Sequence, residues 1–135
     1  MSRHSFSAAL GSSSVLAFTL ACGDHALSPA PCSQVAVSIT AGLQPAFSWD
    51  PACRIEGLSV HLPGPGPVVW STMSSRLSNT IATPVTYGVF PDGAAQTANI
   101  LLPLVAGTRY QVMLFRLDDG PGGSLRPVGV TTFVP

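Results

Sequence analysis

The stretch that most constrains the fold is residues 102–117, which read LPLVAGTRYQVMLFRL. A turn of small residues around Gly107 comes first, and Tyr110 then begins a run in which inward and outward positions alternate. This pattern is typical of a strand that crosses between the two sheets of a β-sandwich. In such a strand the tyrosine ring enters the core and its hydroxyl returns to the backbone just upstream. We therefore predict an all-β sandwich in which Tyr110 holds the crossover in place.

The composition favours many short strands in one domain. The chain of 135 residues contains 13 glycines and 13 prolines, which favour tight turns over long helices. Only 9% of its residues are charged, and six arginines balance six acidic residues. Without a basic stripe there is no electrostatic basis for binding nucleic acid, so we expect no such partner.

Alternation of apolar and polar residues predicts where the strands lie. The expected extended segments are residues 34–40, 45–49, 55–62, 68–73, 81–90, 109–117 and 128–134. Within 55–62, Glu56 shares a face with Leu58, and His61 is on the opposite face. Pro84 and Gly88 interrupt 81–90, which predicts an edge strand or a bulged strand there.

The N-terminal residues resemble an export signal. Residues 1–5 are mildly basic, and residues 10–21, LGSSSVLAFTLA, carry no charge and are too short to span a membrane. Residues 19–23, TLACG, resemble the lipobox of bacterial lipoproteins. The resemblance implies that signal peptide 1–21 is removed and that the thiol of Cys22 is acylated. Residues 22–33 then form the lipidated cysteine and a short tether.

One residue departs from the lipobox pattern. Thr19 stands where the family has a branched aliphatic residue three positions before the cysteine. A plain secretory signal followed by a spare thiol is therefore the alternative to a lipid anchor.

Two cysteines remain once Cys22 is assigned to the anchor. Cys32 and Cys53 belong to a chain predicted to be exported, and two thiols of a small exported domain usually pair. Closing a loop of about twenty residues contributes on the order of 3 kcal/mol. Pairing also requires Cα atoms within about 7 Å, so the start of the first strand must lie beside the turn after Trp49.

The domain resembles the fibronectin type III family over residues 34–135. The matching residues are Pro45, Phe47 and Trp49 early in the domain, and Leu104, Gly107, Thr108, Tyr110 and Val112 late in it. The resemblance implies a fibronectin type III or immunoglobulin-like β-sandwich of about seven strands. A disulfide is not a feature of the family, and Pro84 disturbs the middle strands. A related sandwich of another topology therefore remains an alternative.

Residues that could carry chemistry are few. His61, Asp50 and the serines supply the residue types of a serine hydrolase, but no Gly-x-Ser-x-Gly motif is present, so we assign no catalytic residue. We also predict no metal site and no cofactor. Trp70, Tyr87 and Phe90 are candidates for an exposed aromatic platform that faces a glycan or a protein, and the alternative is that these rings lie in the core.

These observations favour a lipoprotein of the bacterial cell envelope, held on the outer membrane or the cell surface. Its sandwich is expected to act as a non-catalytic binding or scaffolding module whose partners are the membrane and a protein or glycan. The alternative is a small secreted carbohydrate-binding domain or hydrolase that uses His61 and surface aromatic residues. Fold alone does not decide between these functions.

Overall fold

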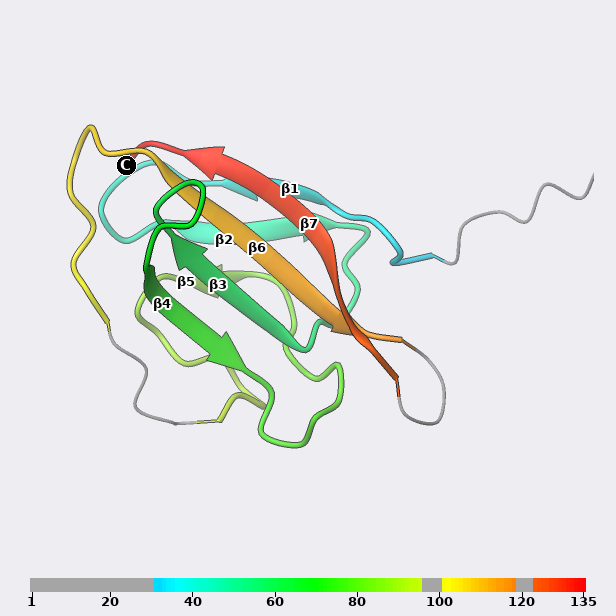
Figure 1. Cartoon of the computed structure of the whole chain (residues 1–135). Helices are drawn as coiled ribbons and strands as arrows, with labels where there is room; N and C mark the ends of the chain where they lie inside the picture. Colours follow the sequence, from blue (N-terminus) through cyan, green and yellow to red (C-terminus); the bar gives the residue numbers. More distant parts are fainter. Residues whose placement is uncertain (1–30, 96–100, 119–122) are drawn as a thin grey trace, which may run out of the picture.

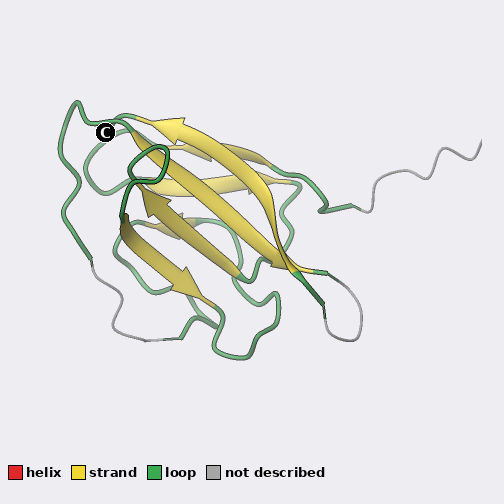
Figure 2. Ribbon diagram, viewed as in Figure 1, coloured by secondary structure: helices red, strands yellow, loops and turns green. Residues whose placement is uncertain are grey.

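The computed structural model describes residues 31–95, 101–118 and 123–135, which form a sandwich of two β-sheets (Figure 1). The strands are β1 (Ala36–Ile39), β2 (Ala46–Asp50), β3 (Gly57–His61), β4 (Val68–Met73), β5 (Val85–Thr86), β6 (Tyr110–Leu117) and β7 (Leu125–Phe133). Strands and loops make up all of the described chain, as Figure 2 shows. The predicted signal peptide, Cys22 and most of the tether lie outside the described residues.

All neighbouring strands pair antiparallel, in one sheet of three strands and one of four. The smaller sheet has the order β1-β2-β5, and the larger sheet has the order β4-β3-β6-β7. The backbone N–H of Val35 donates to the carbonyl of Val128 at 2.8 Å, so the chain just before β1 also contacts the edge strand β7. This architecture confirms the prediction of an all-β sandwich. Among the described residues, no helix is long and apolar enough to cross a membrane.

The core lies between the two sheets and consists of the inward residues of the alternating strands. Its buried apolar residues are Val35, Phe47, Trp49, Ile55, Leu58, Val60, Val69, Trp70, Ile81, Val85, Tyr87, Leu104, Tyr110, Val112, Leu114 and Val128. Successive side chains of a strand point to opposite faces, so the alternation seen in the sequence becomes one buried face for each sheet.

Tyr110 occupies the position that the sequence predicts. Its side chain is buried, and its hydroxyl accepts a hydrogen bond of 3.0 Å from the backbone N–H of Val105. The ring also packs against Phe133 of β7, with ring centroids 5.8 Å apart. The crossover segment is thereby tied both to the core and to its own backbone, which confirms the predicted tyrosine corner.

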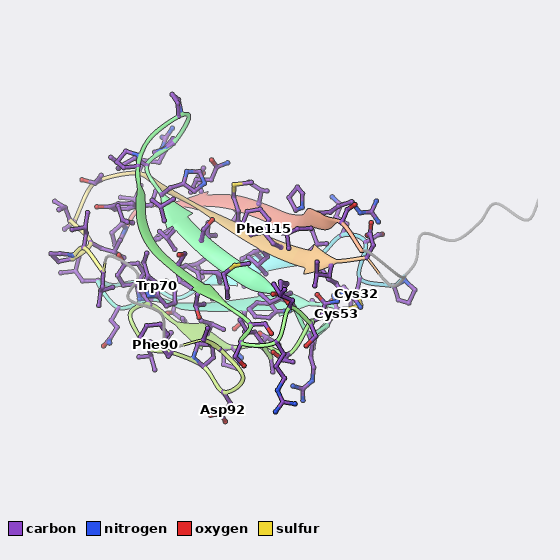
Figure 3. The ribbon with its side chains drawn as sticks, turned by 60° about the horizontal axis from the view of Figure 1, so that its bottom comes forward. Cys32, Cys53, Trp70, Phe90, Asp92 and Phe115 are labelled. Carbon is purple, nitrogen blue, oxygen red and sulfur yellow. A yellow bond between two sulfur atoms is a disulfide. The ribbon has the colours of Figure 1, made fainter. Side chains whose placement is uncertain are left out.

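The disulfide between Cys32 and Cys53 is present, with the two Cα atoms 5.9 Å apart. Figure 3 shows both cysteines at the end of the sandwich where the chain enters β1. The indole Nε1 of Trp49 donates to the carbonyl of Cys53 at 2.7 Å, so the same turn is also held from the core side. The start of β1 therefore lies beside the turn after Trp49, as the pairing requires.

The middle of the chain differs from the predicted strands. Only Val85–Thr86 of residues 81–90 form a strand, β5, which pairs with β2 at one edge of the smaller sheet. Ile81 joins the fold through a single bridge to Ile55. Pro84 cannot donate a ladder hydrogen bond, and Gly88 adopts a positive φ of 77°, so strand pairing is short between them.

Candidate functional site

Two of the three candidate platform residues lie in the core, as the alternative interpretation expects. Trp70 is 1% exposed and Tyr87 is 4% exposed, and their rings pack in the core with centroids 5.1 Å apart. Phe90 is the exposed member, at 41%. It lies on the side of the molecule that also carries Asp92 (Figure 3), where it lines a shallow depression with Arg54. The three rings therefore do not form a common surface.

Trp70 is buried together with the residue before it because β4 is irregular. The register between β3 and β4 shifts between Val60 and His61, so Val60 lies opposite Trp70 whereas His61 lies opposite Val68. Val69 is the extra residue of this bulge, and Val69 and Trp70 are both buried.

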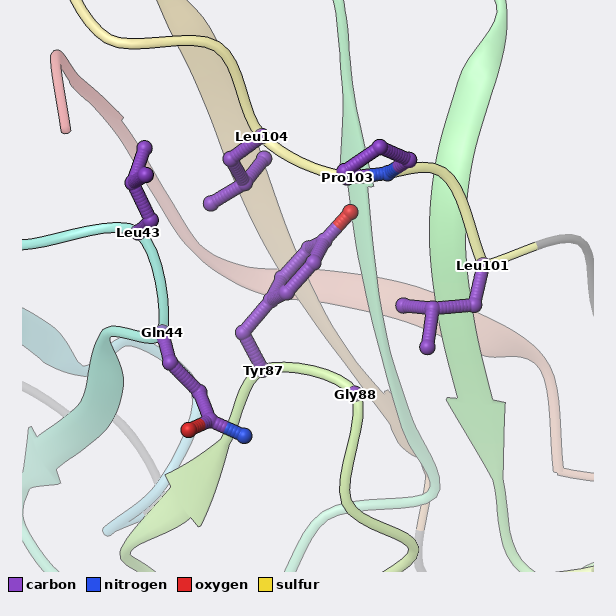
Figure 4. A pocket seen from close by; sticks show the side chains of 7 residues that line it. All are labelled: Leu43, Gln44, Tyr87, Gly88, Leu101, Pro103 and Leu104. Carbon is purple, nitrogen blue, oxygen red and sulfur yellow. The ribbon is translucent and has the colours of Figure 1, made fainter.

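Tyr87 forms the floor of an apolar groove at the end of the sandwich that is remote from the disulfide (Figure 4). The groove has a volume of about 340 Å³ and is lined by Leu43, Gln44, Tyr87, Gly88, Leu101, Pro103 and Leu104. Its two walls come from the loop between β1 and β2 and from the segment that precedes β6. Apolar side chains dominate the lining, so the groove is suited to an apolar group.

The hydroxyl of Tyr87 has a structural role in this groove. It donates a short hydrogen bond of 2.6 Å to the carbonyl of Leu102. Burial, together with a smaller contribution from the charge of Tyr110, raises the pKa of Tyr87 to about 12. The phenol is therefore neutral near pH 7, and it fixes the groove wall rather than transferring a proton.

A second hollow lies at the opposite end of the sandwich, beside the disulfide. It has a volume of about 360 Å³, and its polar lining includes Ser33, Arg116, Asp118 and Arg126. The guanidinium of Arg126 pairs with the carboxylate of Asp118, with its Nε 2.6 Å from Oδ1. This pair is exposed to solvent, so it contributes little to stability. The hollow thus carries charged side chains that the first groove lacks, while apolar atoms make up most of the surface of both.

The residue types of a hydrolase are not brought together. His61 ends β3, and its Nδ1 lies 2.9 Å from the carbonyl of Leu62. Asp50 ends β2 at the other end of the sandwich, opposite the first residue of β1. Among the described residues, no group of three or more His, Cys, Asp or Glu side chains could hold a metal ion.

Glu56 is an acidic residue inside the core. It lies on the inward face of the β3 segment, as the alternation predicts, and is only 1% exposed. Within the described residues, neither of its carboxylate oxygens has a hydrogen-bond partner, and the buried hydroxyl of Thr72 on β4 has none there either. Desolvation by burial raises the pKa of Glu56. A raised pKa favours the protonated, neutral form of the carboxyl group, which costs less free energy to bury than the charged form.

Replacing Glu56 with glutamine is expected to change how stability depends on pH. In the unfolded chain Glu56 loses its proton near pH 4.5, whereas the folded chain retains it to higher pH. Between these two pKa values the folded state binds more protons, so the free energy of unfolding of the native chain falls as pH rises. Urea unfolding from pH 4 to pH 8 should show this fall for the native chain and a smaller one for Glu56→Gln. Parallel profiles would contradict a neutral Glu56 in the fold.

The sequence contains a signal for Glu56 but only a weak one for the groove. The alternation of the strand places Glu56 on the inward face, whereas the polarity of its side chain favours an exposed position. The groove forms where Leu43 of one turn meets Leu101 and Pro103 of a distant segment, about sixty residues later. Apolar residues in segments expected to be turns are the one hint of such a site.

Comparison with known proteins gives no relative for this chain: no family model, no curated protein and no solved structure matches it.

Proposed function

We propose that the protein is a lipoprotein of the bacterial cell envelope whose fibronectin type III-like domain is a non-catalytic binding or scaffolding module. The observation that carries the proposal is the leader with a mildly basic start and an uncharged segment, residues 10–21, that ends directly before Cys22, a short tether and a domain. The disulfide between Cys32 and Cys53 supports it, because such bonds persist in exported proteins and are rare in the cytosol.

Two features support the fibronectin type III-like assignment of the domain. β4 pairs with β3 in the four-stranded sheet, whereas in immunoglobulin constant domains the fourth strand belongs to the sheet of the first two. The hydroxyl of Tyr110 accepts its hydrogen bond five residues upstream, within the motif that carries the resemblance.

The intact mass of the mature protein, purified from membranes, tests the anchor. The expected chain begins at Cys22, carries the mass of two or three acyl chains, and lacks the two hydrogens that the disulfide removes. A Cys22→Ala variant should carry no acyl mass. A Cys53→Ala variant is the matched control, and it should keep the acyl mass while losing the disulfide. An unmodified thiol at Cys22 in the mature native protein would falsify the lipid anchor.

A further inference from the structure

Charged residues gather at one end of the sandwich. Apart from the buried Glu56, the described Asp and Arg residues at or near this end are Asp50, Arg54, Arg76, Asp92, Arg116, Asp118 and Arg126. The chain enters the domain at the same end, beside the disulfide (Figure 1). At the opposite end, within the parts of the chain that the structure describes, Arg109 is the one such residue. Charged side chains are therefore concentrated where the domain is tethered, where Leu77 (81%) and Leu125 (46%) are also exposed, and among the described residues they are nearly absent from the far end.

The far end exposes several large apolar side chains, and we call it the apolar end. Its exposed members are Leu43 (54%), Val68 (51%), Leu101 (51%), Leu102 (44%), Val105 (59%) and Val134 (54%). They belong to one continuous region, because the backbone N–H of Leu102 donates to Val69 at 3.0 Å and that of Gly107 donates to Pro135 at 3.3 Å. The groove floored by Tyr87 connects Leu43 to Leu101 within this region.

We propose that the apolar end docks on the lipid bilayer that holds the N-terminus of the chain. The region consists of loop tips on either side of a groove and not of one flat face, and a fluid acyl layer accepts such a surface without a matching shape. Arg109 is exposed beside these tips, where its long side chain can reach lipid headgroups while its stem remains among apolar groups. No acidic residue among those described lies there to oppose an anionic surface.

The length of the tether allows this orientation, an argument that rests on the proposed anchor at Cys22. Cys32 is fixed to the domain by its disulfide, so the free tether covers the ten Cα–Cα steps from Cys22 to Cys32, which reach roughly 35 Å when fully extended. The longest strand, β7, has nine residues and spans about 30 Å. The extended tether is thus slightly longer than β7, so it can run alongside the strands while the far end of the domain meets the membrane.

A tryptophan reporter tests the docking. The mature protein that the cell makes, carrying Val105→Trp, is mixed with phosphatidylcholine and phosphatidylglycerol vesicles that contain brominated acyl chains. We expect its emission to shift to the blue and to be quenched. Val130→Trp is the matched control, because Val130 is 48% exposed on the outer face of β7, away from the apolar end. The native Trp49 and Trp70 are buried and give the same background in both variants.

A second substitution ties the signal to the apolar end. Adding Leu43→Gln to Val105→Trp should lower the equilibrium constant for docking about tenfold, because one leucine can no longer be buried in lipid. Equal quenching of both reporters, or quenching of neither, would overturn the proposal. So would a blue shift that depends on protein concentration without vesicles, since that result indicates contact between copies. The intact mass reports on the anchor separately, so a failure of docking and a failure of the anchor are distinguishable.

Discussion

Replacing Trp70 with alanine is expected to lower the free energy of unfolding by about 3–5 kcal/mol, the usual effect of removing a large buried ring. Trp70 is 1% exposed, lies opposite Val60 in the larger sheet and contacts the ring of Tyr87. The cavity would open next to the hydrogen bond from Tyr87 to Leu102, so the surrounding segment has little freedom to collapse into it. Urea or thermal unfolding measures the change.

Phe90→Ala is the matched control for Trp70→Ala. Phe90 is 41% exposed and lies in a loop, so its loss should change the free energy of unfolding by less than about 1 kcal/mol. If Trp70→Ala were as stable as the native chain, or Phe90→Ala were the more damaging of the two, the assignment of Trp70 to the core would be wrong.

Alternation within strands made much of this fold predictable. Phe47 and Trp49 of β2 are both buried, and the inward residues of β6 begin with Tyr110. These predictions depend on local geometry, because a half-buried strand needs apolar residues at every second position. The tyrosine corner was predictable for the same reason: Tyr110 and Val105, the backbone partner of its hydroxyl, are only five residues apart.

Features that depend on distant pairing could not be predicted. The bulge that buries Val69 beside Trp70 exists only because β4 is aligned with β3, and the sequence of β4, VVWSTM, does not say which of its three leading apolar residues point inward. The sequence indicates that aromatic rings in strands are usually buried. It does not indicate which of the three candidate rings is exposed. Phe90 is exposed because it follows the short strand β5, whose length is set between Pro84 and Gly88.

The amide of Asn79 shows the same limit in a polar group. Its side chain donates to the carbonyl of Leu117 at 3.0 Å and accepts from the N–H of the same residue at 2.9 Å. The backbone pairing between β3 and β6 ends near Glu56, so it does not reach the last residues of β6. The side-chain amide of Asn79 takes the place of a neighbouring strand there. The sequence around a polar loop residue does not reveal that its hydrogen-bond partner lies 38 residues away.

Removing the disulfide with the double substitution Cys32→Ala and Cys53→Ala is expected to lower the free energy of unfolding by about 3 kcal/mol, from the chain-entropy relation. The two cysteines are 21 residues apart, and the bond limits the conformations of that loop in the unfolded chain. Within the fold, the neighbouring hydrogen bond from Trp49 to Cys53 does not require the bond between sulfurs. The variant should therefore keep its near-UV circular dichroism while unfolding at lower urea concentration.

A reducing agent provides the control for the double substitution. It should lower the stability of the native chain to that of the variant and leave the variant itself unchanged, because only the native chain has a bond to lose. If the variant is as stable as the oxidised native chain, the bond does not constrain the unfolded state as argued. If the variant cannot fold at all, the disulfide has a larger role, because it then holds the start of β1, which contacts both β2 and β7, against the rest of the sandwich.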